Sequence, residues 1–300
     1  MEKYLRSLIE DIKQDGDYIQ YLINKEVLDF FPADFFVLNT EQERLEAWKN
    51  IKVSLKDIGE FNKVSNPYYI GFGNPEADLL IVGQEKAFNA FNNPELMLYE
   101  SINNSFQWSK ITSNKGDVSE INFDPRNPRK HHDGGRSGNH TWSKYSILAD
   151  AFYSINSCQA NMKNHWNQSN GDTLFDKVFI TELNVTPAAS NSGIHLTKQR
   201  NELLSHPFFK DFKVVLFAIG NPEAGKKAQK EVSKLFNGIN FKVASIGKYG
   251  KDKNRNIATT TFENQVIVIC NQLSGSSGWR NDHIVALGKK LRGLVNKNNM

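Results

Sequence analysis

The stretch Ala77–Phe88, ADLLIVGQEKAF, decides the fold of this chain. Its uninterrupted apolar run, Leu79–Val82, ends at a glycine, which is typical of a central strand in a sheet covered on both faces. In open α/β sheets, ligands bind at the carboxyl ends of such strands. The stretch therefore predicts that Gln84, Glu85 and Lys86 lie at the rim of a binding crevice. A helix-starting loop with surface charges is the alternative interpretation.

Hydrophobic periodicity along the rest of the chain predicts strands that alternate with helices. The expected strands cover residues 79–82, 177–181, 213–219, 241–246 and 266–270, and the expected helices cover 142–154, 197–204 and a C-terminal segment from Asp282. This alternation indicates a three-layer α/β/α fold with a central, largely parallel sheet of about four to five strands. Residues 1–62 show apolar residues at helical spacing, so we expect an N-terminal helical extension, 1–62, before an α/β domain, 63–300.

The composition is that of a globular chain. Its 300 residues are 39% hydrophobic and include 20 Phe and 5 Trp, enough for a substantial core. No apolar stretch approaches the roughly 20 residues that span a bilayer, and the N-terminal sequence lacks the apolar region of a signal peptide, so we expect a cytoplasmic protein without a membrane partner. Cys158 and Cys270 cannot supply all the thiolates of an iron–sulfur cluster or an all-cysteine zinc site. The histidines do not fall at metal-ligand spacing, so we expect no metal and no other cofactor.

Positive charge is concentrated in two loop segments, although the net charge is only +4. The cations of these segments are Arg126, Arg129, Lys130 and Arg136 in the first, and Lys251, Lys253 and Arg255 in the second. Such loops contact DNA phosphates by releasing counterions, without reading the base sequence. Solvated loops that keep the protein soluble are the alternative interpretation.

Segments in chain order resemble motifs of the uracil-DNA glycosylase superfamily. They are Leu79–Phe88 (LLIVGQEKAF), Val178–Pro187 (VFITELNVTP), Val214–Lys227 (VVLFAIGNPEAGKK) and Val266–Ser276 (VIVICNQLSGS). The first is similar to the family's water-activating strand and turn, and the second to the strand whose asparagine reads the base. The third is similar to an apolar strand with a lysine-rich helix start, and the fourth to the strand and loop that enter the minor groove. The resemblance covers residues 68–295 and implies the family's fold and base-excising activity.

The first motif departs from the family at the proposed catalytic position. Glu85 stands where the family carries Asp or Asn, so the resemblance implies that Glu85, beside Gln84, positions water and stabilises positive charge on the sugar. Lys86 replaces the family's proline and can donate to the leaving base or form a Schiff base as in lyases. An ion pair of this lysine with Glu85 or Glu182 is the simpler interpretation. Phe88 lies near the family's base-screening aromatic residue, which implies that it stacks on the base.

The second motif bears on the substrate. An ungapped alignment places Glu182 at the base-reading position, with Asn184 following on the same face if the strand continues. An ionised Glu182 offers only acceptors, which suits an exocyclic amine of cytosine or adenine and repels the O4 atom of uracil. If the alignment instead slips by two residues, Asn184 reads uracil in the usual way. Both interpretations remain open at this level.

The fourth motif supplies candidates for leaving-group and DNA contacts. Asn271 stands where the main uracil glycosylases have a histidine that stabilises the departing base, so the resemblance implies a weaker electrophile at this position. Leu273 is then the candidate wedge that fills the gap left by a flipped nucleotide. Ser274 and Ser276 are candidates for phosphate contacts. A Ser/Gly-rich turn before a helix also needs no ligand, which is the alternative.

Taken together, these features predict a metal-free, monomeric, monofunctional DNA glycosylase. It would flip a uracil, a deaminated base or a modified base, such as a modified cytosine, out of DNA and hydrolyse its N-glycosidic bond during base excision. Besides DNA repair, removal of modified bases from phage DNA is an alternative role in phage defence. A non-catalytic DNA- or nucleotide-binding module on the same fold is a further alternative.

Overall fold

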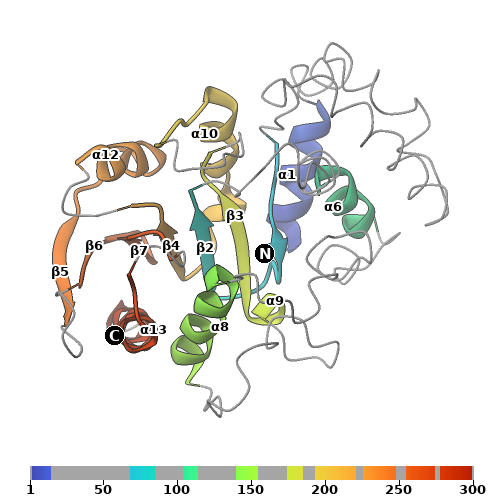
Figure 1. Ribbon diagram of the computed structural model, residues 1–300. Helices are drawn as coiled ribbons and strands as arrows, with labels where there is room; N and C mark the ends of the chain where they lie inside the picture. Colours follow the sequence, from blue (N-terminus) through green and yellow to red (C-terminus); the bar gives the residue numbers. More distant parts are fainter. Residues whose placement is uncertain are drawn as a thin grey trace, which may run out of the picture. The chain divides into compact units, whose positions relative to one another are not determined.

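The computed structural model describes residues 2–14, 68–84, 104–113, 140–154, 174–184, 193–220, 226–247, 255–273 and 278–298 (Figure 1). The chain divides into two compact units. Unit 1 comprises Met1–Gly71, Glu85–His132 and Asn184–Leu203, and unit 2 comprises Phe72–Gln84, Asp133–Leu183 and Leu204–Met300. Among the residues that the structure describes, no helix has the length and hydrophobicity needed to cross a membrane.

Unit 2 is built on a seven-stranded sheet, ordered β1-β3-β2-β4-β7-β6-β5. The strands are β1 (Phe72–Gly73), β2 (Leu79–Gly83), β3 (Val178–Glu182), β4 (Val214–Ala218), β5 (Lys242–Gly247), β6 (Arg255–Phe262) and β7 (Gln265–Cys270). The central strands β3, β2, β4 and β7 are parallel, whereas β1, β6 and β5 pair antiparallel with their neighbours. The expected α/β class with a parallel centre is confirmed.

The sheet is larger than the four to five strands expected from the sequence, because β1 and β6 were not predicted. β1 has only two residues and therefore no periodicity to detect. β6 has the sequence RNIATTTF, in which threonines replace the apolar run of a central strand, and only Ile257 and Ala258 are buried. The other expected strands are confirmed, with ends that differ by one or two residues.

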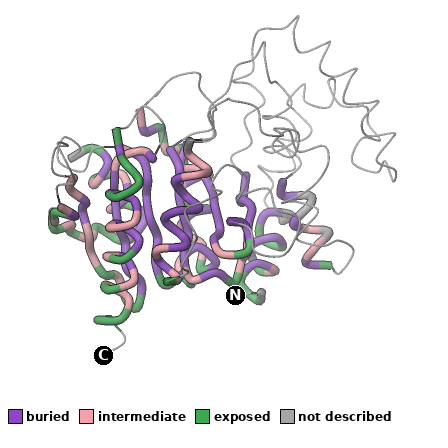
Figure 2. The backbone as a smooth tube through the Cα atoms, turned by 60° about the horizontal axis from the view of Figure 1, so that its bottom comes forward, coloured by how far each residue is buried: buried purple, intermediate pink, exposed green. Residues whose placement is uncertain are grey.

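Helices cover both faces of the sheet in unit 2. They are α8 (His140–Tyr153), α9 (Leu174–Lys177), α11 (Pro207–Lys210), α12 (Lys226–Leu235) and α13 (Asn281–Asn298). α8 and α13 pack side by side on one face, and α12 lies on the opposite side (Figure 1). Every residue of β2, β4 and β7 is buried between these layers, and exposed positions gather on the outer sides of the helices (Figure 2). Burial on both faces explains why these strands lack polar alternation.

Unit 1 contains α1 (Glu2–Gln14), α6 (Asn104–Thr112) and the beginning of α10 (Lys198–Leu204). The apolar residues of α1 recur at helical spacing and are buried: Leu5, Leu8, Ile9 and Ile12. Trp108 of α6 is fully buried, and its Nε1 donates to Gly71 O at 2.8 Å. α1 confirms the expected helix for residues 2–14. The boundary between residues 62 and 63 stays a prediction, because it falls outside the described residues.

Candidate active site

The chain leaves the carboxyl ends of β2 and β4 in opposite directions. The next strand after β2 is β3 on one side of it, whereas every strand after β4 lies on the other side. Such a switch point leaves a crevice between the diverging loops, and open parallel sheets bind ligands there. At this point the register pairs Gly83 of β2 with Ala218 of β4. Both residues are small, so neither side chain extends far from the ends of these strands.

The carboxylate of Glu182 lies over Gly83 at this point. Glu182 is the last residue of β3 and pairs with Gly83, and Leu183 N donates to Gly83 O at 2.8 Å. A Cβ built on Gly83 would lie 2.1 Å from Oε2 of Glu182 and 2.9 Å from its Cδ. The side chain of Glu182 therefore leans from β3 across β2, toward the switch point. Gly83 is required for this position because a larger residue would overlap the carboxylate.

One face of the sheet brings Glu182 together with Tyr145 of α8. The register places Glu182, Gly83, Ala218 and Cys270 at one level of neighbouring strands, so their side-chain positions share a face. Burial raises the pKa of the Tyr145 hydroxyl well above its usual value, and the negative charge of Glu182 raises it further. Burial likewise raises the pKa of the Cys270 thiol. Both groups are therefore neutral at physiological pH.

Gln84 and Asn271 follow the ends of β2 and β7 at the same edge. Gln84 is only 2% exposed, while Asn271 is half-buried. The ladder between β4 and β7 continues to this level, since Ile219 N and Gly220 N both donate to Cys270 O at 3.2 Å. The structure thus places Gln84, Glu182 and Asn271 at the ends of parallel strands of one sheet. Their chemical roles remain predictions.

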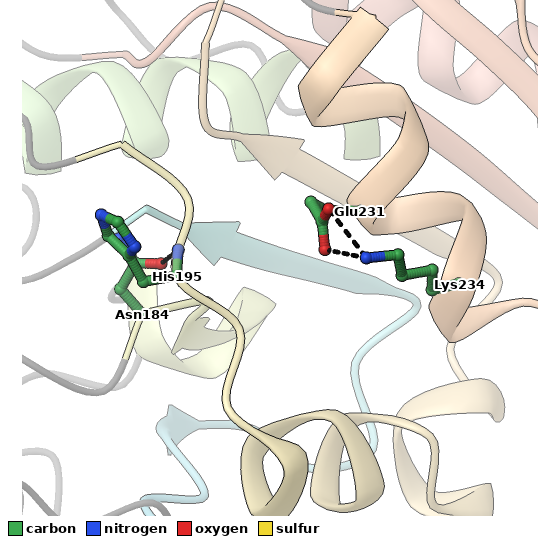
Figure 3. Close-up of polar contacts among 4 residues, drawn as sticks. All are labelled: Asn184, His195, Glu231 and Lys234. Atoms are coloured by element: carbon green, nitrogen blue, oxygen red, sulfur yellow. Dashed lines mark hydrogen bonds and ion pairs between the residues drawn. The ribbon is translucent and has the colours of Figure 1, made fainter.

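Asn184 does not continue the strand that ends at Glu182. Its side-chain amide belongs to unit 1, where Oδ1 accepts from His195 N at 2.8 Å (Figure 3). Its Nδ2 donates to Gly193 O at 2.5 Å. Both ends of the amide therefore hold the backbone of residues 193–195. β3 ends at Glu182, so the condition under which strand geometry would carry Asn184 onto the face of Glu182 is not met. The base-reading role of Asn184 stays a prediction.

Leu273 is fully buried, with 0% of its surface exposed. A wedge between bases needs an exposed apolar side chain, so this burial argues against the role predicted for Leu273. Arg255 is the one member of the basic loop segments that falls within the described residues, and it begins β6. The remaining predicted site residues lie outside the described residues: Glu85, Lys86, Phe88, Arg126, Arg129, Lys130, Arg136, Lys251, Lys253, Ser274 and Ser276.

Sequence reasoning missed the importance of Gly83 and Tyr145. In the sequence, Gly83 marks only the end of a strand, and Tyr145 is only one position within the helix expected over residues 142–154. The signal for Gly83 was present, because a glycine at a strand end permits a close approach by a neighbouring side chain. No local signal existed for Tyr145, since its proximity to Glu182 depends on how α8 packs against the sheet.

No group of three or more His, Cys, Asp or Glu side chains that could hold a metal ion occurs among the described residues. No protein-family model matches the chain, and no curated protein matches it in sequence.

Proposed function

We propose that the chain is a DNA glycosylase that hydrolyses the N-glycosidic bond of a flipped-out base carrying an exocyclic amine. The observation that supports this proposal is the Glu182 carboxylate lying over Gly83 at the switch point of a parallel sheet. A crevice at this place is where open sheets bind ligands, and a carboxylate there can select the base that enters.

In the proposed reaction, Glu182 accepts hydrogen bonds from the exocyclic amine and orients the base. Water attacks C1′ of the sugar, the C1′–N bond breaks, and its electron pair leaves with the base. The amide of Asn271 donates to the developing negative charge on the base, and Glu85 takes the proton of the attacking water. The roles of Asn271 and Glu85 follow from the resemblance of their motifs, and that of Glu182 from its chemistry as an acceptor.

The hydrogen bonds of Asn184 favour Glu182 over Asn184 as the base-reading residue. The amide of Asn184 already binds Gly193 and His195, so reading a base would cost these bonds. An acceptor-only carboxylate then favours amino-bearing bases, including cytosines modified elsewhere on the ring. Release of modified cytosines would suit the alternative role in defence against phage DNA.

The test measures free bases released from synthetic DNA by mass spectrometry. Single-stranded and duplex substrates each contain one candidate base: uracil, hypoxanthine, adenine, cytosine or a 5-substituted cytosine. We expect the wild-type protein to release an amino-bearing base in preference to uracil. In Glu182→Gln, the ratio of uracil release to release of the amino-bearing base should rise about tenfold to a hundredfold. The reason is that an amide also offers a donor, and one such contact is worth about 1–3 kcal/mol of discrimination.

Glu231→Gln provides the matched control. Glu231 and Lys234 form an ion pair on α12, with both carboxylate oxygens 2.8 Å from Nζ (Figure 3). This variant removes a carboxylate from the same unit without touching the switch point, so it should keep the wild-type base preference. Uracil release that survives Glu182→Gln and disappears in Asn184→Ala would overturn the assignment of Glu182. DNA binding without release of any base would instead identify a non-catalytic binding module.

A further inference from the structure

Arg255 lies at the carboxyl edge of the parallel strands, next to the segment that leads into α13. β6 runs antiparallel to β7 with Ala258 opposite Ile269, so Arg255 extends past the end of β7. Its Nη2 donates to Gly278 O at 2.6 Å. Gly278 has a φ of +66°, and a Cβ at this position would lie 3.0 Å from the same Nη2. A glycine therefore allows the guanidinium to approach the backbone closely before α13 begins.

Two N–H donors beside this hydrogen bond are buried. Trp279, which follows Gly278, is 3% exposed, and its ring contacts that of His283 with centroids 6.1 Å apart. Within the part of the chain that the structure describes, neither Trp279 Nε1 nor Arg255 Nε has a hydrogen-bond partner, although both atoms are buried. Buried donors of this kind are costly, and an acceptor atom from a ligand would satisfy them.

Lys144 adds a second cation to this place. It lies on α8, which packs along α13, and is 8% exposed. At that contact a Cβ on Gly288 would lie 2.6 Å from Leu148 O. Burial and the nearby charge of Arg255 lower the pKa of the Lys144 ammonium. The two side chains carry charge of the same sign, and a bound anion would interact favourably with both.

We propose that Lys144, Arg255 and Trp279 form a binding site for a phosphate group. Phosphate suits this set because it offers several acceptor oxygens and negative charge to donors that are cationic or neutral N–H groups. α8 and α13 both begin at this edge of the sheet, and the positive ends of their helix dipoles favour an anion there. A backbone phosphate of DNA and a free phosphate present the same oxygens. If the ligand is a DNA phosphate, the site deepens the contact expected for Arg255 and rests on the proposed function.

Isothermal titration calorimetry with the full-length protein tests the site. Its probes are inorganic phosphate and a short single-stranded oligothymidylate. We expect at least one probe to bind, and affinity for it to fall about tenfold or more in Arg255→Gln and in Lys144→Met, as expected for charge-assisted hydrogen bonds. Trp279→Phe removes the N–H but keeps an aromatic ring, and we expect it to weaken binding about fivefold. Trp279→Phe is a conservative change, so its affinity for the probe decides whether the site exists if a charge variant fails to fold.

Lys213→Met is the matched control, since it removes a cation that pairs with Asp78 at 2.9 Å before the start of β4. Wild-type affinity should survive this change. Oligothymidylate binding without phosphate binding identifies the DNA backbone as the source of the ligand, and the reverse identifies a free phosphate. The site is refuted if neither probe binds, or if Trp279→Phe and Lys144→Met bind as tightly as Lys213→Met. Phosphate binding in a protein that releases no base would leave the site standing while the glycosylase proposal fails.

Discussion

Gly83 is the residue on which the candidate site depends most directly. It ends the apolar strand that identifies the fold, and the absence of a side chain lets the Glu182 carboxylate lie across β2. At the same scale, Asn184 shows how a residue singled out by its motif can have a structural role. Its amide bridges the backbone of Gly193 and His195. The side chain of Glu182 thus lies at the switch point, whereas that of Asn184 holds the backbone of residues 193–195.

Gly83→Ala should impair function without unfolding the protein. The new Cβ would fall 2.1 Å from Oε2 of Glu182, so the carboxylate must move, but it is the flexible end of a side chain and can do so. We expect the free energy of unfolding to change by less than about 1 kcal/mol, and base release to fall about tenfold or more. Denaturant titration and single-turnover base release provide the two measurements. Wild-type base release by this variant would contradict the placement of Glu182.

At the scale of elements, the pair α8 and α13 covers the face of the sheet that bears the candidate site. The two helices approach closely at Gly288, where a Cβ would meet Leu148 O at 2.6 Å and Ala151 Cβ at 2.7 Å. This contact holds α8 against α13, and with it the positions of Lys144 and Tyr145. A small residue at one helix contact thus affects the geometry of the edge where the strands end.

Gly288→Ala and Gly293→Ala should have opposite effects, although both replace a glycine in α13. At Gly288 the added methyl group meets backbone atoms that cannot turn away, and we expect a loss of about 1–3 kcal/mol in the free energy of unfolding. At Gly293 nothing lies within 4 Å of the built Cβ. Alanine there should stabilise the protein by about 0.5–1 kcal/mol, because it restricts the unfolded chain and favours the helix. Denaturant titration of both variants measures the difference, and equal stabilisation would show that the helices do not pack as described.

At the scale of the whole molecule, the stability at alkaline pH depends on the half-buried Tyr153. Tyr153, at the end of α8, accepts a hydrogen bond from Asp78 N at 3.1 Å. Burial raises its pKa to about 12, against an ordinary tyrosine value of 10.0. Between these values the hydroxyl ionises in the unfolded chain while it stays protonated in the folded protein. The unfolded state therefore binds fewer protons in this window, and stability must fall as pH rises through it.

Tyr153→Phe isolates this contribution. The variant loses the hydrogen bond to Asp78 N, so it should be less stable than the wild type by about 0.5–1.5 kcal/mol below pH 10. Above that pH the wild type should lose stability more steeply, and the gap between the two proteins should narrow up to about pH 12. Free energies of unfolding from urea titrations at a series of pH values measure this gap. A gap that stays constant over the whole range would contradict the burial of the Tyr153 hydroxyl.

Much of the sheet was predictable because its central strands are continuous apolar runs. Leu79–Val82 and Val266–Cys270 need burial on both faces, and the centre of a sheet covered by helices provides this burial. β6 was missed because its threonines lack that signal, although packing beside β7 makes it a strand. Of the candidate site, Glu182 and Asn271 were indicated by the resemblance of their motifs to the uracil-DNA glycosylase superfamily. The same resemblance predicted a wedge role for Leu273, which the structure instead buries in the core.

The sequence by itself determined which segments form the buried strands and the C-terminal helix, because apolar runs and helical spacing are local properties. Only the tertiary structure decided the order β3-β2-β4-β7, and with it the side-by-side placement of Gly83 and Glu182. It also decided which residues of α8 reach the ends of the strands. Strand order and helix packing arise from contacts between residues far apart in the chain, where many pairings of similar apolar segments compete. For this reason the strand that ends at Gly83 could be found from sequence alone, whereas the position of the Glu182 carboxylate could not.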